Sequence, residues 1–261
     1  EFVFGDWSSD VCSSDLTFFR QVVAERRLAL VGGMFVMPEV AEPCGEALIR
    51  QILTGQRWLE DTFGLRSDCG WFIDTFGQIP QIPQILRRCG FRYNMFWRDI
   101  PLNVDFAAMP ANFYWQAPDG SRILTHWLPG GYDSTKTQVG INLAHQTSGH
   151  LLQPYGGDVA RPPRRFSEIR EVMNKKLALF NITDPHMDIV TGPEYMALIE
   201  KEADTLPVIQ CDFNPPYRAA DLRGCYSNRI ELKKRNRQAE ASLFNAELLA
   251  KIGRASCRER V

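Results

Sequence analysis

The sequence lacks any apolar run long enough to cross a bilayer, and it lacks a strong net charge. Its 261 residues carry 30 basic and 31 acidic side chains, which leaves a formal charge of −1. This balance gives no electrostatic reason to expect a nucleic-acid partner or an anionic membrane partner. The missing apolar run argues against a transmembrane helix. The remaining composition is that of a globular protein, and a small neutral substrate suits it.

Common metal-binding and redox patterns are also absent. The seven cysteines include no Cys-x-x-Cys pair, and the four histidines are scattered. This argues against a thiolate zinc site and against a redox dithiol. We find no secretory signal peptide, so a reducing cytoplasm is the default expectation, while a secreted or periplasmic location stays open if the start is missing.

The two ends of the chain differ from the rest. Ser8-Ser9-Asp10 recurs as Ser13-Ser14-Asp15 in a tract without periodicity, and an amphipathic pattern stops at Lys251. Both tracts resemble translations of a sequencing adapter, so we expect residues 1–16 and 251–261 to be non-native. The rest is then an interior fragment of a longer protein. Ordinary ragged termini are the alternative.

Helix-like and strand-like segments alternate over the next part of the chain. Residues 44–63 have helical periodicity, and Gly64 is placed as their C-terminal stop. Residues 70–74 and 91–97 are strand-like, with a short helix over 83–89 between them. This alternation is typical of a parallel sheet with crossover helices, and therefore of the α/β class.

The second half of the chain is more varied. Pro118-Asp119-Gly120 between two apolar runs predicts a hairpin over residues 113–127. After it we expect a loop over 140–165, a helix over 167–180, a short strand over 188–190, a capping box at 191–194 with a helix to about 203, a strand over 207–212 and a long helix over 229–250. The last helix has the character of a separate, all-helical unit.

Asp74 is the most informative carboxylate, because it follows Trp71-Phe72-Ile73 and precedes a glycine turn. A carboxylate inside a core is costly unless it is paired or bound to a metal. We therefore place Asp74 at the mouth of a strand, where barrel enzymes keep their catalytic groups. Asp212 ends a similar strand, and Asp133 follows the hairpin. Paired carboxylates suggest glycosidic cleavage, although a turn-forming role explains Asp133 equally well.

Three sequence blocks in a fixed order carry a family resemblance: Gly32 to Val36, Gly45 to Gln56 and Trp71 to Gly77. Together they resemble glycoside hydrolase family 38, the α-mannosidases. Looser similarity follows at 118–121, 126–129, 212–213, 224–229 and 233–237, so the resemblance covers about residues 28–250.

The resemblance implies a partial seven-stranded β/α barrel at residues 17–212 and the start of a helical middle domain at 213–250. It implies retaining hydrolysis of terminal α-linked mannose from an oligosaccharide or glycoside, assisted by zinc. Asp74 would be the nucleophile and a zinc ligand, and Asp133 the general acid. The candidate substrate contacts are Trp71, Arg98, Asp158, Asp212 and Tyr226.

The chain departs from the family pattern at three places. Gln78 stands where many members have histidine, no histidine lies near residues 224–229, and the zinc motif that pairs a histidine with an aspartate should lie upstream of residue 17. We therefore expect the chain by itself to be inactive and to bind zinc weakly. A non-catalytic carbohydrate-binding or structural relative is one alternative. Another sugar-active barrel enzyme, such as a polysaccharide deacetylase, is the other.

Overall fold

The computed structural model describes residues 13–98, 100, 108–132, 136–157, 165–214 and 224–258. A five-stranded sheet lies at its centre, in the order β1-β2-β4-β3-β5. The strands are β1 (Cys69–Phe72), β2 (Tyr93–Phe96), β3 (Asn112–Gln116), β4 (Arg122–Trp127) and β5 (Val208–Ile209). Strands β1, β2 and β4 are parallel, and β3 is antiparallel to β4. The predicted parallel sheet and the predicted hairpin are therefore both confirmed.

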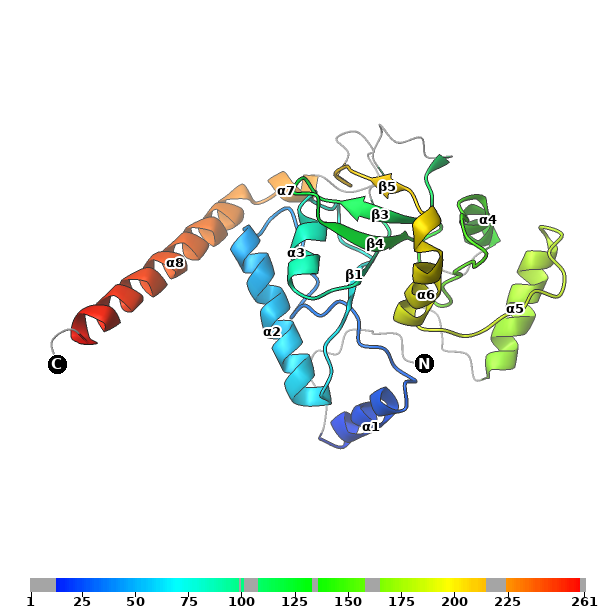
Figure 1. Ribbon diagram of the computed structural model, residues 1–261, viewed down its shortest axis with the longest axis horizontal. Helices are drawn as coiled ribbons and strands as arrows, with labels where there is room; N and C mark the ends of the chain where they lie inside the picture. The colour runs from blue at the N-terminus through cyan, green and yellow to red at the C-terminus, as the bar shows by residue number, and fades with distance from the viewer. Residues whose placement is uncertain are drawn as a thin grey trace.

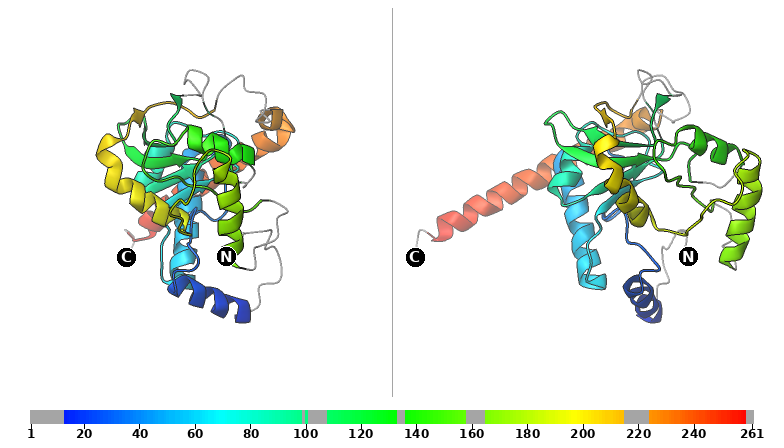
Figure 2. Two further views of the ribbon diagram at one scale, coloured as in Figure 1. Left: turned by 90° about the vertical axis from the view of Figure 1, so that its right-hand side faces the viewer. Right: turned by 45° about the vertical axis from the view of Figure 1, so that its right-hand side comes forward.

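Helices cover both faces of this sheet (Figure 1). They are α1 (Ser13–Ala24), α2 (Gly45–Phe63), α3 (Ile82–Arg88), α4 (Lys136–Ala144), α5 (Phe166–Ala178), α6 (Gly192–Ile199), a 3-10 helix η2 (Glu200–Thr205), α7 (Gly224–Ser227) and α8 (Ile230–Arg258). Helix α8 projects away from the rest of the molecule in Figure 1 and in the right view of Figure 2. None of the helices in the described ranges has both the length and the apolar character that a membrane crossing needs.

The core has two layers, one on each face of the sheet, because side chains along a strand alternate between the two faces. Phe72 and Phe96 pack with residues of α2 and α3 on one face of the sheet. Tyr93 and Met95 pack with α6 on the other face. Because successive strand residues point to opposite faces, each central strand is buried on both sides, as expected for parallel strands covered by helices.

One backbone bridge connects the two edges of the sheet. Gln78, which follows edge strand β1, donates to Phe213 O at 2.8 Å, and Phe213 N donates back at 3.0 Å. Phe213 follows β5, the opposite edge strand, and it is fully buried against Phe96, Phe113 and Trp115. The segments after the two edge strands therefore meet. Five strands lie in the described residues, so the seven-stranded barrel stays a prediction.

The helix boundaries follow from local chemistry. The Cys44 sulfur accepts the Ala47 N–H at the start of α2, and Gly64 ends this helix with φ +70°. Glycine adopts this left-handed conformation without a Cβ clash. At the start of α6, the Glu194 carboxylate accepts the Thr191 N–H at 2.8 Å, which completes the predicted capping box.

Several predicted elements were wrong in kind or extent. Residues 188–190 form no strand, and Ile189 and Val190 remain 44% and 36% exposed without a neighbouring strand to pair with. The strand expected over 207–212 contains only two residues, because the chain leaves β3 to pair Phe213 with Gln78. Residues 140–144 belong to α4 and not to a loop.

The described parts of the two terminal tracts, residues 13–16 and 251–258, are helical, although we expected no periodic structure there. Helix α1 begins at Ser13, and α8 continues through residues 251–258. The helix expected to reach 203 ends at Ile199 and continues as η2. The non-native origin of the two tracts stays a prediction.

Candidate functional site

Asp74 and Arg98 meet where the parallel strands end. Each lies two residues beyond its strand, and the register pairs Phe72 of β1 with Phe96 of β2, so equal offsets bring the two side chains together. Arg98 Nε donates to Asp74 Oδ1 at 2.7 Å, and Nη2 donates to the same oxygen. The side chains of Asp74 and Arg98 are 46% and 20% exposed. The structure therefore places the predicted nucleophile and one predicted substrate contact in a single, accessible ion pair.

Aromatic rings hold the guanidinium of Arg98. Its central carbon lies 5.0 Å from the Phe76 ring centroid and 4.3 Å from that of Trp97. Tyr132 contacts Trp97 edge to face, with centroids 5.0 Å apart. Gly131 has φ +76°, and an added Cβ would lie 2.8 Å from the Trp97 ring, so the backbone there passes directly over the indole. Asp133, the next residue after Tyr132, lies outside the described residues.

The turn that follows Asp74 is anchored by the loop before α2. Thr75 is buried, and its hydroxyl donates to Pro38 O at 3.4 Å. The Phe76 N–H donates to both carboxylate oxygens of Glu39, at 3.0 and 3.3 Å. Gly77 has φ +92°, and its N–H donates to Thr75 O at 3.1 Å.

Glu39 lies in a charged and partly buried setting. Burial is the main cause that raises the pKa of its carboxyl group, and the hydrogen bond from Phe76 opposes this rise. The negative charges of Glu42 and Asp74 raise the pKa further, whereas the Tyr226 hydroxyl lowers it. Tyr226, a predicted substrate contact, therefore lies beside Glu39.

The other predicted contacts have different positions. Trp71 is half-buried and packs in the α6 layer, where an added Cβ on Gly192 would lie 3.1 Å from its ring. Asp212 is exposed and directly precedes the Phe213 bridge to Gln78. Asp158 lies outside the described residues.

Three of the histidines have recorded partners other than Asp74. His145 Nδ1 is 2.8 Å from Met109 O, His150 approaches Glu202 at 3.5 Å, and His186 pairs with Asp188 at 2.9 Å. The described part of the chain contains no group of three or more His, Cys, Asp or Glu side chains that could hold a metal ion. A protein zinc site needs about three or four ligands. Asp74 supplies one carboxylate, which is already paired with Arg98, so it does not form a zinc site by itself.

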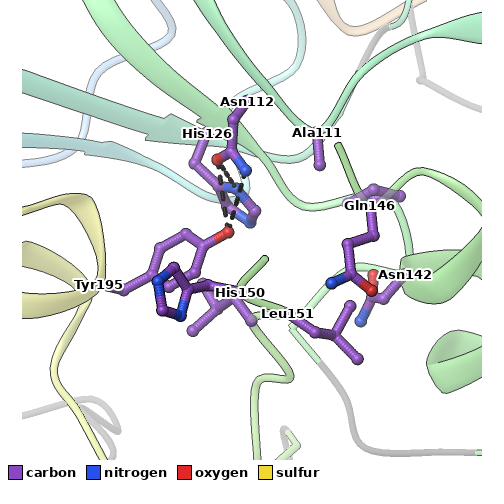
Figure 3. Close-up of a pocket in the computed structure, with 10 residues that line it drawn as sticks. Ala111, Asn112, His126, Asn142, Gln146, His150, Leu151 and Tyr195 are labelled. Atoms are coloured by element: carbon purple, nitrogen blue, oxygen red, sulfur yellow. Dashed lines mark hydrogen bonds between the residues drawn. The ribbon is translucent and has the colours of Figure 1, made fainter. Parts of the chain in front are cut away.

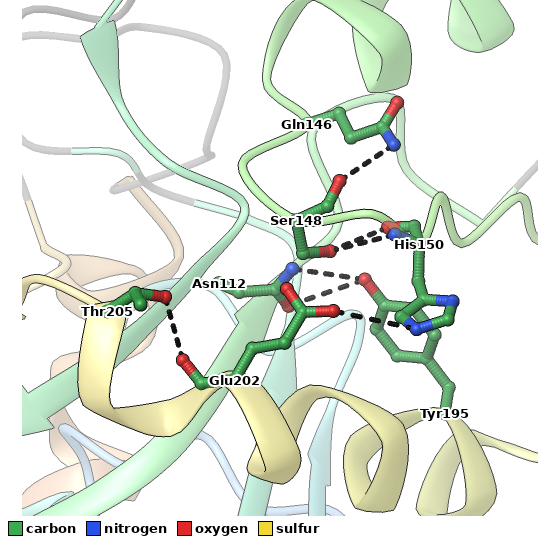
Figure 4. Close-up of polar contacts among 7 residues, drawn as sticks. All are labelled: Asn112, Gln146, Ser148, His150, Tyr195, Glu202 and Thr205. Carbon is green, nitrogen blue, oxygen red and sulfur yellow. Dashed lines mark hydrogen bonds and ion pairs between the residues drawn. The ribbon is translucent and has the colours of Figure 1, made fainter.

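The fourth histidine belongs to a buried polar network beside a small pocket (Figure 3). His126 Nδ1 lies 2.8 Å from Asn112 Oδ1, and Asn112 Nδ2 donates to the Tyr195 hydroxyl at 3.1 Å. Burial lowers the pKa of His126 to about 3. The pocket has a volume of about 10 Å³, which is room for about one water molecule. Figure 4 shows the outer rim, where His150 reaches Glu202 on η2.

The anchoring role of Glu39 and Thr75 was not predicted from the sequence. A usable signal was present, because Glu39 follows the apolar run Met34 to Pro38 and precedes Val40, which is buried. This is the same pattern of a carboxylate at the end of an apolar run that singled out Asp74.

Comparison with known proteins places this site in a family. The family model described as "Glycosyl hydrolases family 38 N-terminal domain" matches residues 2–218. The chain belongs to glycosyl hydrolase family 38. The resemblance inferred from the three motif blocks is therefore confirmed, and the Asp74–Arg98 pair lies within the matched domain of this family 38 chain.

Named relatives of the family 38 chain are α-mannosidases. "Alpha-mannosidase 2C1" of Homo sapiens is 28% identical over 235 residues, which are 86% of this chain and 22% of the relative. The "Alpha-mannosidase" of Saccharomyces cerevisiae is 27% identical over 256 residues, 89% of this chain and 23% of the relative. The chain thus spans less than a quarter of the length of either relative.

A solved structure shows the same fold. The alpha-mannosidase from Enterococcus faecalis V583 superimposes with a TM-score of 0.62 at 18% sequence identity. The match covers 77% of this chain and 24% of that one. The described residues therefore share the mixed α/β fold of a segment of that structure.

Proposed function

We propose that this family 38 chain is part of a retaining α-mannosidase that hydrolyses terminal α-linked mannose in oligosaccharides or glycosides. The Asp74–Arg98 ion pair at the carboxyl end of the parallel strands carries the proposal, because it puts an accessible carboxylate where a barrel enzyme keeps its nucleophile. The names of the relatives support mannose as the substrate class.

Asp74 would attack the anomeric carbon and form a glycosyl-enzyme intermediate. Arg98 Nε and Nη2 both donate to Oδ1, and no hydrogen bond from the described residues reaches Oδ2. Oδ2 is then the oxygen that attacks, while Arg98 fixes the orientation of the carboxylate. The aromatic contacts of Arg98 with Phe76 and Trp97 hold the guanidinium in turn.

Asp133 would protonate the leaving oxygen and then, as a base, activate the water that releases mannose. A retaining enzyme needs its two carboxyl groups about 5–5.5 Å apart. The contact of Tyr132 with Trp97 supports this assignment, since it directs the chain toward the side of Arg98 just before Asp133.

Trapping and peptide mapping test the assignment of the nucleophile. We expect a 2-fluoro or 5-fluoro mannosyl fluoride to label Asp74 in a full-length form of the protein, and Asp74→Asn to abolish turnover of an aryl α-mannoside. As a matched control, Asp61→Asn removes an exposed carboxylate of α2, outside the proposed site, and leaves labelling of Asp74 in place. Label on another residue of active enzyme contradicts the proposal.

We propose zinc binding for the whole protein and not for this chain alone. The family resemblance assigns further ligands to sequence upstream of residue 17 and near residue 224, and the steps above use only residues of this chain.

We also propose that the chain alone is inactive. Residues 17–212 would belong to a seven-stranded barrel, residues 213–250 would begin a helical bundle, and residues 1–16 and 251–261 would be non-native.

A second function, carbohydrate binding without catalysis, is favoured by one sequence feature. No histidine lies near Gly224 to Arg229, where the family pattern has a zinc ligand. Metal analysis of a full-length form separates the two functions. Stoichiometric zinc with mannoside turnover rejects the non-catalytic function, and saturable mannoside binding without turnover or zinc rejects the enzymatic one.

A further inference from the structure

The segment that carries Asp74 lies beyond the sheet. Strand β1 ends at Phe72, so residues 73–77 are not held by the ladder of strand hydrogen bonds. Such a segment keeps one geometry only where its polar groups find partners. Gln78 finds them at Phe213, and Thr75 and Phe76 find them in the loop before α2.

Glu39 supplies the only charged partner that the described residues give to this backbone. Its two oxygens share the Phe76 N–H, and an ionised acceptor makes such a bond stronger than a neutral one. Phe76 lies two residues after Asp74, close enough for a shift of its backbone to move the Asp74 carboxylate.

Glu39 is itself held in place. In its loop, Phe35 N donates to Gln51 O at 3.0 Å, and Val36 N donates to Gln51 Oε1 at 3.1 Å. Gln51 belongs to α2, and Val40, directly after Glu39, is 1% exposed. The loop is thus attached to a helix and to the core, so its carboxylate can act as a fixed support.

Glu39 and Arg98 act on the same short turn from two directions. Arg98 binds the Asp74 carboxylate and stacks over the Phe76 ring, whereas Glu39 binds the Phe76 N–H. From these contacts we propose that Glu39 is a positioning residue, which fixes the turn so that the Asp74 carboxylate stays beside Arg98. This inference rests on the proposed role of Asp74 as nucleophile.

Hydrogen exchange of the Phe76 amide tests the contact in the 261-residue chain, without any need for activity. Glu39→Ala removes the acceptor and should speed exchange of this amide by about tenfold. Glu39→Gln keeps an acceptor oxygen and should retain most of the protection. Glu42→Ala is the matched control, because Glu42 is a carboxylate of the same loop that pairs with Lys233 and not with the turn.

Kinetics of a full-length form test the positioning itself. Glu39→Ala should lower kcat on the order of 10- to 100-fold with little change in KM, since displacement of a reacting group slows the chemical step more than binding. Glu39→Gln should restore most of this loss, and Glu42→Ala should leave kcat unchanged.

The outcomes separate the two proposals. Unchanged Phe76 exchange in Glu39→Ala overturns the positioning role, as does an unchanged kcat in a protein that Asp74→Asn inactivates. A fully active Asp74→Asn overturns the proposed nucleophile instead, whatever the exchange result. Equal losses of stability and kcat in Glu39→Ala and Glu39→Gln would indicate a general structural role and also overturn the inference.

Discussion

At the scale of single residues, His126 is a buried histidine that belongs to a polar network. It is 3% exposed, and burial lowers its pKa to about 3, against about 6.5 for an unfolded chain. The neutral ring fits its surroundings, because its Nδ1–H can donate to Asn112 Oδ1 while Asn112 Nδ2 donates to Tyr195. Protonation of the ring would place an unpaired charge inside the protein.

This burial predicts an acid-sensitive stability. The folded-state pKa lies below the unfolded one, so the stabilisation is complete above about pH 6.5 and is lost as the pH falls toward about 3. The slope for one proton is at most about 1.4 kcal/mol per pH unit. His126→Asn should therefore lose less free energy of unfolding between pH 6 and pH 4 than the unsubstituted chain, as measured by urea denaturation at each pH.

His186→Asn is the matched control for this measurement. The His186 side chain is 88% exposed, so its removal should change the free energy of unfolding by less than about 0.5 kcal/mol at either pH. An equal pH slope in His126→Asn and the unsubstituted chain contradicts the prediction.

Single residues also show what the sequence can and cannot reveal about the site. Asp74 and Arg98 were predictable, because each directly follows an apolar strand and parallel strands end at one edge. The Asn112–His126–Tyr195 network was not, since Asn112 and Tyr195 are 83 residues apart and no local pattern connects them. The role of Glu39 could have been predicted in the same way as that of Asp74, because both carboxylates follow an apolar run.

At the scale of elements, α2 was well predicted because its signals are local. Apolar periodicity and Gly64 define its extent, and neither depends on distant contacts. Residues 188–190 were wrongly assigned for the opposite reason: a strand needs a neighbour, and three apolar residues do not report whether one is present. The length of β5 could not be predicted for the same reason, because the strand ends where the chain leaves β3 and pairs Phe213 with Gln78.

Helix α2 passes close to the backbone of residues 33–35 at Gly55. An added Cβ there would lie 2.6 Å from Phe35 N and 2.7 Å from Gly33 O, which are backbone atoms and cannot rotate away. Gly55→Ala should therefore displace α2 from the loop that carries Glu39, and it should destabilise the fold by about 1–3 kcal/mol despite the better helix propensity of alanine.

Gly45, in the same helix, provides the matched control for Gly55→Ala. An added Cβ at Gly45 meets nothing within 4 Å. Gly45→Ala should leave the free energy of unfolding, measured by urea denaturation, unchanged or raise it by about 0.5–1 kcal/mol at most. A Gly55→Ala variant as stable as Gly45→Ala would mean that α2 does not pack on residues 33–35.

At the scale of the whole molecule, α8 is attached to the body mainly through polar contacts. Arg50 of α2 binds both carboxylate oxygens of Glu247, at 2.6 and 2.7 Å, and Lys233 pairs with Glu42 at 3.2 Å. Leu243, Leu248 and Leu249 remain 61%, 58% and 67% exposed. Large apolar side chains grouped on one exposed helix usually mark a surface that another element covers.

The exposed leucines predict that the 261-residue chain self-associates and binds an apolar dye. Substitution of Leu243, Leu248 and Leu249 by glutamine should shift the chain toward monomer in sedimentation velocity and lower dye fluorescence, because these residues supply apolar contact area. The control replaces Gln238, Ser242 and Asn245, exposed neutral residues of the same helix, by alanine and should leave association unchanged.

The edge strand β1 is the other candidate surface for self-association. If the leucine variant and the control variant associate equally, the association occurs through this sheet edge and not through α8. A monomeric chain that melts cooperatively, binds no dye and hydrolyses mannosides would contradict both this prediction and the proposed inactivity of the chain alone.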